Sequence, residues 1–128
     1  MDNKEYKIET PTKENSVFFK KYNNKDITEI KKDDIIAKLK TVFDPEIPVN
    51  IYDLGLIYEI HIDAKNNIKI IMTLTTPNCP VADTMPKTVG DSLDNIKGIS
   101  TLKVELVWEP QWTKEMMSED AKLALDIY

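Results

Sequence analysis

Two neighbouring segments of alternating polarity constrain this fold more than any other feature of the sequence. Apolar residues recur at every second position from Leu56 to Asp63, and the same alternation continues from Ile68 to Leu74. A period of two is typical of β-strands that bury one face and expose the other. The Asn66-Asn67 pair between the segments favours a tight turn. The sequence therefore predicts an antiparallel hairpin with one buried face.

Apolar residues at helical spacing lie on both sides of this hairpin, which makes an all-β fold untenable. In chain order the expected elements are a helix capped by Asp33 or Asp34 and ended by Pro45, the two strands, a helix from Ala82 to Ile96 stopped by Gly98, a strand from Leu102 to Trp108, and a short helix capped by Ser118. This order, α-β-β-α-β-α, predicts an α+β domain of two layers, with helices packed on one face of a small mixed sheet.

Composition narrows the classes of protein that this chain can belong to. The 128 residues suit one domain, and no apolar run approaches the roughly 20 residues that span a bilayer. All 17 basic residues are lysines and the net charge is −5, which argues against a nucleic-acid partner. The polar start of the chain lacks a secretory core, and a single cysteine cannot form an internal disulfide. We therefore expect a cytoplasmic protein that does not enter a membrane.

The first 32 residues differ in composition from the rest of the chain. They are rich in lysine, glutamate and asparagine, and we expect residues 1–32 to form a mobile polar extension before the folded domain of residues 33–128. The Phe18-Phe19 pair could dock on a partner or fold back on the domain. Folding back is favoured, because adjacent exposed aromatic side chains promote association.

The only cysteine, Cys79, lies between a predicted strand and a predicted helix. A helix that begins at Asn78 would place the thiol in its first turn, where free N–H groups stabilise a thiolate, but would carry Pro86 in its interior. A helix capped by Asp83 would hold Pro86 in its first turn and leave Cys79 in the preceding loop. A buried structural cysteine is the alternative to either functional arrangement.

Other polar residues have more than one interpretation. Asp44 and Glu46 lie on a proline-stiffened turn and could be metal ligands, proton acceptors or turn caps, with the turn favoured by their spacing. Thr75 and Thr76 are ordinary β-branched strand residues or hydroxyls directed at whatever Cys79 holds. His61 alternates with acidic residues on the polar strand face and is expected to be solvated.

Four motifs taken together resemble the SufT/PaaD-like metal-sulfur cluster biosynthesis family. The motifs are Asp44-Pro45-Glu46, the segment from Ile51 to Tyr58, the segment from Met72 to Pro80, and the segment from Leu106 to Thr113. The resemblance covers residue 33 to about residue 128 and implies an iron-sulfur cluster assembly fold. It also implies a role in maturing iron-sulfur proteins alongside the SUF machinery. The functional cluster of the family falls on Asp44, Glu46, Thr75, Thr76 and Cys79.

Ligand counting limits the mechanism that this resemblance implies. An iron-sulfur cluster usually takes four protein ligands, and one chain offers a single thiolate. We therefore expect a non-enzymatic carrier whose transient cluster or iron is shared through Cys79 with a second chain of a homodimer, an assembly scaffold or a client apoprotein. The alternatives are a PaaD-like accessory subunit of a ring-hydroxylating oxygenase complex, a thiol redox enzyme using Cys79, and an interaction module with a structural cysteine.

Overall fold

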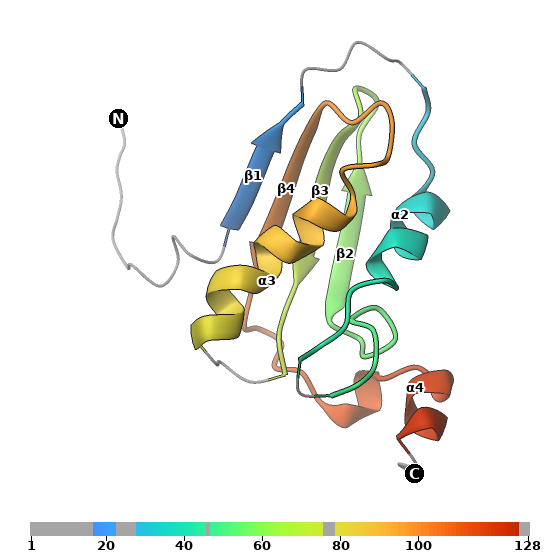
Figure 1. The fold of residues 1–128 in the computed structure, drawn as a ribbon, viewed down its shortest axis with the longest axis vertical. Coiled ribbons are helices and arrows are strands. Elements are labelled where there is room, and N and C mark those ends of the chain that lie inside the picture. The colour runs from blue at the N-terminus through green and yellow to red at the C-terminus, as the bar shows by residue number, and fades with distance from the viewer. Residues whose placement is uncertain (1–16, 23–27, 46, 76–78, 126–128) are drawn as a thin grey trace.

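A computed structural model describes residues 17–22, 28–45, 47–75 and 79–125 (Figure 1). The elements in chain order are β1 (Val17–Lys21), α2 (Lys32–Leu39), β2 (Ile57–Ile62), β3 (Asn67–Met72), α3 (Cys79–Ser92), β4 (Thr101–Leu106), the 3₁₀ turn η2 (Lys114–Met116) and α4 (Glu119–Ala124). The four strands form one mixed sheet in the order β1-β4-β3-β2, in which only the β3–β4 pair is parallel. The predicted α+β class is confirmed, with one strand added ahead of the predicted order.

The predicted hairpin is the β2–β3 pair. Its turn residue Asn66 has a φ of +63°, in the left-handed region that asparagine tolerates better than most residues. One detail of the alternation is wrong: the pairing register shifts between Ile57 and Glu59. This β-bulge places Ile57 opposite the buried Met72, so that Ile57 packs on the core where the alternation predicted Tyr58.

The main core lies between the sheet and the two longer helices, which cross the same face of the sheet (Figure 1). Many of its fully buried side chains come from α2, β3, β4, and α3 with the residue that follows it: Ile35, Leu39, Ile70, Met72, Val89, Leu93, Leu102 and Val104. The period of two in the strands and the helical spacing in α2 and α3 therefore point their apolar residues at one another. The predicted packing of helices on one face is confirmed for α2 and α3.

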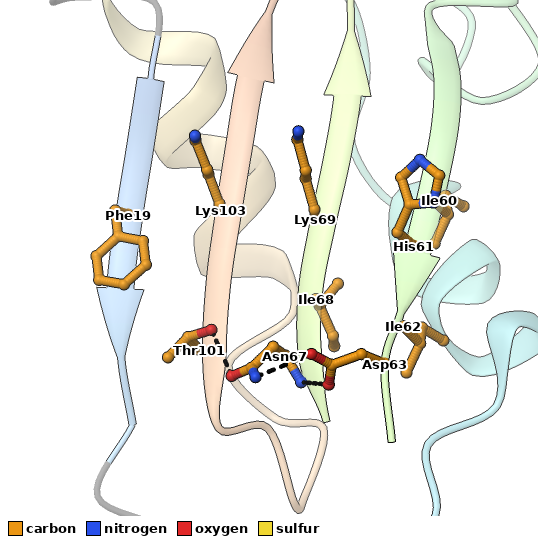
Figure 2. Close-up of a pocket in the computed structure, with 10 residues that line it drawn as sticks. All are labelled: Phe19, Ile60, His61, Ile62, Asp63, Asn67, Ile68, Lys69, Thr101 and Lys103. Carbon is orange, nitrogen blue, oxygen red and sulfur yellow. Dashed lines mark hydrogen bonds between the residues drawn. The ribbon is translucent and has the colours of Figure 1, made fainter. Parts of the chain in front are cut away.

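No helix of the described residues covers the opposite face of the sheet. Figure 2 shows Phe19, Lys103, Lys69 and His61 side by side on this face, one from each strand in sheet order. We call it the open face. As predicted, His61 is exposed to solvent, and its Nε2 lies 2.6 Å from Oε1 of Glu59.

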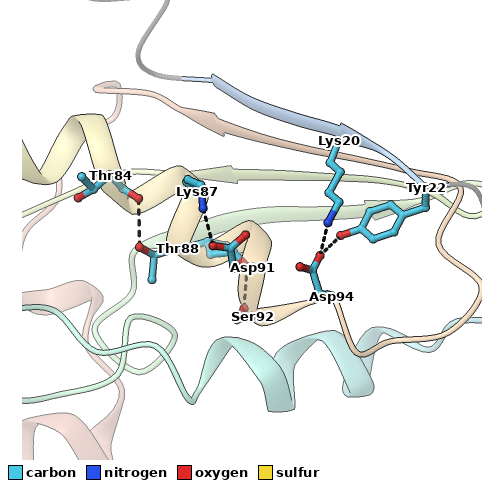
Figure 3. Close-up of polar contacts among 9 residues, drawn as sticks. Lys20, Tyr22, Thr84, Lys87, Thr88, Asp91, Ser92 and Asp94 are labelled. Carbon is cyan, nitrogen blue, oxygen red and sulfur yellow. Dashed lines mark hydrogen bonds and ion pairs between the residues drawn. The ribbon is translucent and has the colours of Figure 1, made fainter.

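The prediction of a mobile extension is wrong for Val17–Lys21, which form the edge strand β1 against β4. The ring of Phe18 packs on the backbone of α3 at Gly90, where a Cβ atom would lie 2.2 Å from Phe18 Cε2. At the other end of the strand, the Tyr22 hydroxyl and the Lys20 ammonium both donate to the Asp94 carboxylate (Figure 3). The predicted fold-back of the aromatic pair is confirmed through Phe18.

The C-terminal segment is held against the turn that precedes β2. Gly55 has a φ of +84°, and a Cβ atom there would lie 2.3 Å from the carbonyl oxygen of Met116. The Trp112 indole N–H donates to the Leu54 carbonyl at 2.7 Å, and the Ser118 N–H donates to the Asp53 carbonyl at 2.8 Å. These contacts anchor the C-terminal segment to the core. As predicted, Ser118 caps the last helix through its Oγ.

Candidate functional site

The structure resolves the two alternatives for the start of the second long helix. Cys79 is the first residue of α3, and Pro86 lies inside the helix. Because proline has no N–H, the carbonyl of Ala82 receives no helical hydrogen bond from position 86. Pro86 is buried. Helix propensity alone would favour a shorter helix here, because proline is unfavourable in a helix interior. The backbone of Cys79 therefore belongs to the first turn, where N–H groups have no intrahelical acceptor.

The start of α3 extends well past the edge strand that the helix packs on. Gly90 contacts Phe18 near the beginning of β1, and Asp94, just after the helix, contacts Tyr22 beyond the strand's end. The helix therefore runs in the same direction as β1. Cys79 precedes Gly90 by 11 residues, or about 16 Å along the helix axis. This projects the start of α3 to the end of the sheet where β3 also ends (Figure 1).

Asp44 lies in a closed turn and is buried, with 6% of its surface exposed. Its Oδ1 accepts the N–H of Ile47 at 2.9 Å, and its own N–H donates to the Val49 carbonyl at 3.2 Å. The bridge between Phe43 and Asn50 closes the base of the turn. The favoured interpretation of Asp44 as a turn cap is confirmed. The turn lies at the end of the sheet where α3 begins (Figure 1).

Thr75 contributes to a pocket at the same end of the molecule. The pocket has a volume of about 240 Å³ and is lined by Thr73, Leu74, Thr75, Trp108, Glu109, Gln111 and Trp112. Trp108 is 38% exposed, whereas the hydrogen bond to Leu54 fixes Trp112. The sequence analysis did not connect Trp108 and Trp112 with Thr75. The pairing of two indoles around a short Glu-Pro-Gln segment was the signal that could have made this connection.

The described residues support the predicted site only in part. Glu46 and Thr76 lie outside them, and so does the side chain of Cys79. The convergence of these groups with Asp44 and Thr75 around one thiol therefore stays a prediction. Among residues 17–22, 28–45, 47–75 and 79–125, no three histidine, cysteine, aspartate or glutamate side chains come close enough to hold a metal ion.

A second hollow, of about 610 Å³, lies on the open face of the sheet and has a different character. Across its floor, Thr101 donates to Asn67 Oδ1 at 2.7 Å, and Asn67 donates to both oxygens of Asp63 at 2.9 and 3.0 Å (Figure 2). The hydrogen bonds from Asn67 lower the pKa of Asp63. This row links three strands next to the hairpin turn and lies on the face opposite α3, so it is not a part of the cysteine site.

Membership of a known family is shown by sequence comparison. The sequence model of the family described as iron-sulfur cluster assembly protein matches residues 32–106. A relative from Porphyromonas gingivalis named "Fe-S protein maturation auxiliary factor" is 50% identical over 93 residues, which cover 73% of this chain and 89% of the relative. "Fe-S protein maturation auxiliary factor SufT" from Staphylococcus aureus is 40% identical over 86 residues, covering 67% of this chain and 98% of the relative.

Solved structures agree with this comparison. A crystal structure from Bacillus anthracis, described as a domain of unknown function (DUF59), superposes with a TM-score of 0.70 at 40% identity and covers 76% of this chain and 92% of that one. A conserved hypothetical protein from Thermotoga maritima superposes with a TM-score of 0.66 at 36% identity, over 77% of this chain and 97% of that one.

Fold and site first define a class: a small α+β domain whose only thiol stands at the start of a helix, next to the end of a mixed sheet. The chain belongs to the iron-sulfur cluster assembly protein family, and its resemblance to SufT is confirmed. The family match begins at residue 32, so the edge strand β1 lies outside it. In the described part of the chain, no helix is both long and apolar enough to cross a membrane.

Proposed function

We propose that this protein is a cytoplasmic, non-enzymatic maturation factor that uses Cys79 to carry or deliver iron-sulfur clusters or iron to client proteins with the SUF machinery. The observation that carries the proposal is the position of the chain's only thiol at the first residue of α3. The names of the relatives with 50% and 40% identity, both Fe-S protein maturation auxiliary factors, support the same role.

The helix start suits a thiol that must bind and release metal. Iron is bound by the thiolate, and the unpaired N–H groups and positive dipole end of a helix favour that form over the neutral thiol. The proposal therefore places the metal-binding sulfur of Cys79 at the N-terminal turn of α3. Asp44, Glu46, Thr75 and Thr76 would surround the held group with oxygen atoms, in a cluster that we carry over from the family.

Partial ligation follows from the cysteine count. Since one chain provides one thiolate and a cluster usually takes four ligands, the remaining positions must come from another protein or a small thiol. A cluster held through a single protein sulfur exchanges its other ligands readily. This property suits delivery to a scaffold or client better than storage or catalysis.

Anaerobic reconstitution with iron and sulfide tests the proposal directly. Wild-type protein, Cys79→Ser, and a variant combining Cys79→Ser with Thr88→Cys would be compared by absorbance and iron content. Thr88 is exposed and lies nine residues along the same helix, about 14 Å from the helix start. The combined variant therefore keeps one accessible thiol per chain and removes only its position in the first turn.

The expected result is that the wild type binds iron and supports maturation of an iron-sulfur enzyme in cells, while both variants lose most of both activities. Equal iron binding by the relocated thiol would show that position in the first turn is irrelevant. Unchanged enzyme maturation in cells that carry only Cys79→Ser would remove the proposed role of the thiol altogether.

A further inference from the structure

The outer edge of β1 carries backbone groups that have no partner strand in the part of the chain that the structure describes. In antiparallel pairing, alternate residues direct both their N–H and C=O groups to the neighbouring strand. Tyr22, which continues the β1 register opposite Ser100, donates its N–H to the Ser100 carbonyl at 2.9 Å. By alternation, the groups of Val17, Phe19 and Lys21 point away from β4. These outward groups form no hydrogen bond with any other described residue.

Two of the three residues whose backbone groups face outward, Val17 and Phe19, carry exposed apolar side chains, and the third is the exposed Lys21. Val17 is 40% exposed and Phe19 is 60% exposed, and both lie on the open face. Lysine side chains commonly guard edges against pairing, but the Lys20 ammonium is bound to Asp94 on the covered face, 3.1 Å from its Oδ1. Phe18, packed at Gly90, keeps the strand extended and attached to the domain. The edge is thus ordered, apolar at Val17 and Phe19, basic at Lys21, and available for pairing.

We propose that β1 pairs antiparallel with β1 of a second copy of this chain, so that two four-stranded sheets join into one. The outward groups allow a two-fold register in which Phe19 lies opposite the partner's Phe19, and Val17 lies opposite the partner's Lys21. Each of these pairs exchanges both backbone hydrogen bonds, which gives about six bonds across the junction.

The sequence of β1 is complementary to itself in this register. The two exposed phenylalanine rings meet at the two-fold axis, where cross-strand aromatic pairs are favourable. The basic end of each strand meets the apolar end of the other, so no lysine faces a lysine. Beyond Val17, the next strand presents Glu105, and the partner's Lys21 would therefore extend toward an acidic side chain. An unrelated extended segment would lack this match at every position.

This dimer keeps the two cysteine sites apart. Each Cys79 backbone lies about 16 Å along α3 from Gly90, past the Val17 end of its own β1. The two-fold axis at Phe19 sends the two helix starts in opposite directions, roughly 30 to 40 Å from each other. One cluster cannot bond to both thiolates across that distance. The pair would present two independent sites, each completed by another protein.

Register-specific cross-linking tests the interface on the full chain. In a Cys79→Ser background, Phe19→Cys would place two thiols in directly opposed positions with Cα atoms about 5.5 Å apart, within disulfide range. Lys21→Cys is the matched control, because its two thiols would be separated by about four residues, or roughly 13 Å. Mild oxidation should cross-link the first variant and leave the second uncross-linked. A mixture of Val17→Cys and Lys21→Cys chains should form the mixed disulfide.

Light scattering supplies the test without cysteines. The wild type should approach 29.4 kDa, twice the 14.7 kDa of one chain, at high micromolar concentration. Phe19→Lys should weaken the dimer at least about tenfold, whereas Phe43→Lys, at a phenylalanine that is 57% exposed elsewhere, should not. A monomeric wild type would overturn the proposal. Equal cross-linking of Phe19→Cys and Lys21→Cys, or equal weakening by both lysine variants, would do the same.

Discussion

The contact between Phe18 and Gly90 explains how the segment Val17–Lys21 is held as an edge strand, and its strength can be measured. Replacing glycine by alanine inside a helix normally stabilises a protein by about 1 kcal/mol. At position 90, however, the new Cβ atom would lie 2.2 Å from Phe18 Cε2 and 2.5 Å from Cδ2. Overpacking of this kind typically costs about 1 to 3 kcal/mol. Gly90→Ala should therefore be neutral or destabilise the protein by up to about 2 kcal/mol.

A second background isolates the contact from helix propensity. In Phe18→Ala the ring is absent, so Gly90→Ala should recover the ordinary gain of about 1 kcal/mol. Urea unfolding of the wild type, the two single variants and the double variant gives the coupling free energy, expected at about 1 to 3 kcal/mol. A coupling below about 0.5 kcal/mol, or stabilisation of the wild type by Gly90→Ala, would refute the packing of β1 on α3 through this ring.

Two further predictions concern carboxylates whose roles the structure defines. The hydrogen bond from Tyr22, followed by the neighbouring Lys20, lowers the pKa of Asp94, so this group stabilises the fold above its unfolded pKa and the effect is lost as pH falls through the folded value. In Asp94→Asn, the free energy of unfolding should therefore decrease less steeply as the pH falls below about 4. The difference should be less than about 1 kcal/mol, because the carboxylate is partly exposed. If the pH dependence of the unfolding free energy in acid is unchanged in the variant, this role of Asp94 is contradicted. At Asp44, the alanine variant should lose about 1 to 3 kcal/mol because the Ile47 N–H loses its acceptor, whereas Asp44→Asn keeps an acceptor oxygen and should lose less. Equal losses in urea unfolding would contradict the capping role.

The parts of the fold that the sequence predicted correctly are those with a local physical signal. The β2–β3 hairpin follows from a period of two on both sides of an asparagine turn, and α4 begins after the predicted Ser118 cap. The register shift after Ile57 has no such signal, since a bulge replaces one apolar residue by its neighbour without changing the composition. Tyr58 is displaced from the predicted face, and its hydroxyl donates to the Pro110 carbonyl at 2.6 Å instead.

The edge strand could not be predicted because its stability depends on distant residues. The hydrogen bond from Tyr22 joins residues 72 positions apart, and Gly90 receives Phe18 only once α3 lies on the sheet. Taken together, the first 32 residues have few apolar side chains, which is why their composition resembles a mobile tail. The same reason applies at Cys79. The local sequence allowed a helix beginning at Asn78 or one capped by Asp83, and the structure holds Pro86 inside the longer α3, where it is buried.

The geometry finally separates association from cluster handling. The proposed dimer contacts involve the edge of β1, which lies outside the family match, whereas Cys79 stands about 16 Å along α3 from the ring that docks that strand. A change at Phe19 should therefore alter mass without altering iron binding, and a change at Cys79 should do the reverse. Because the two helix starts lie roughly 30 to 40 Å apart in such a dimer, its formation would assign the missing cluster ligands to a scaffold or client and not to the second copy.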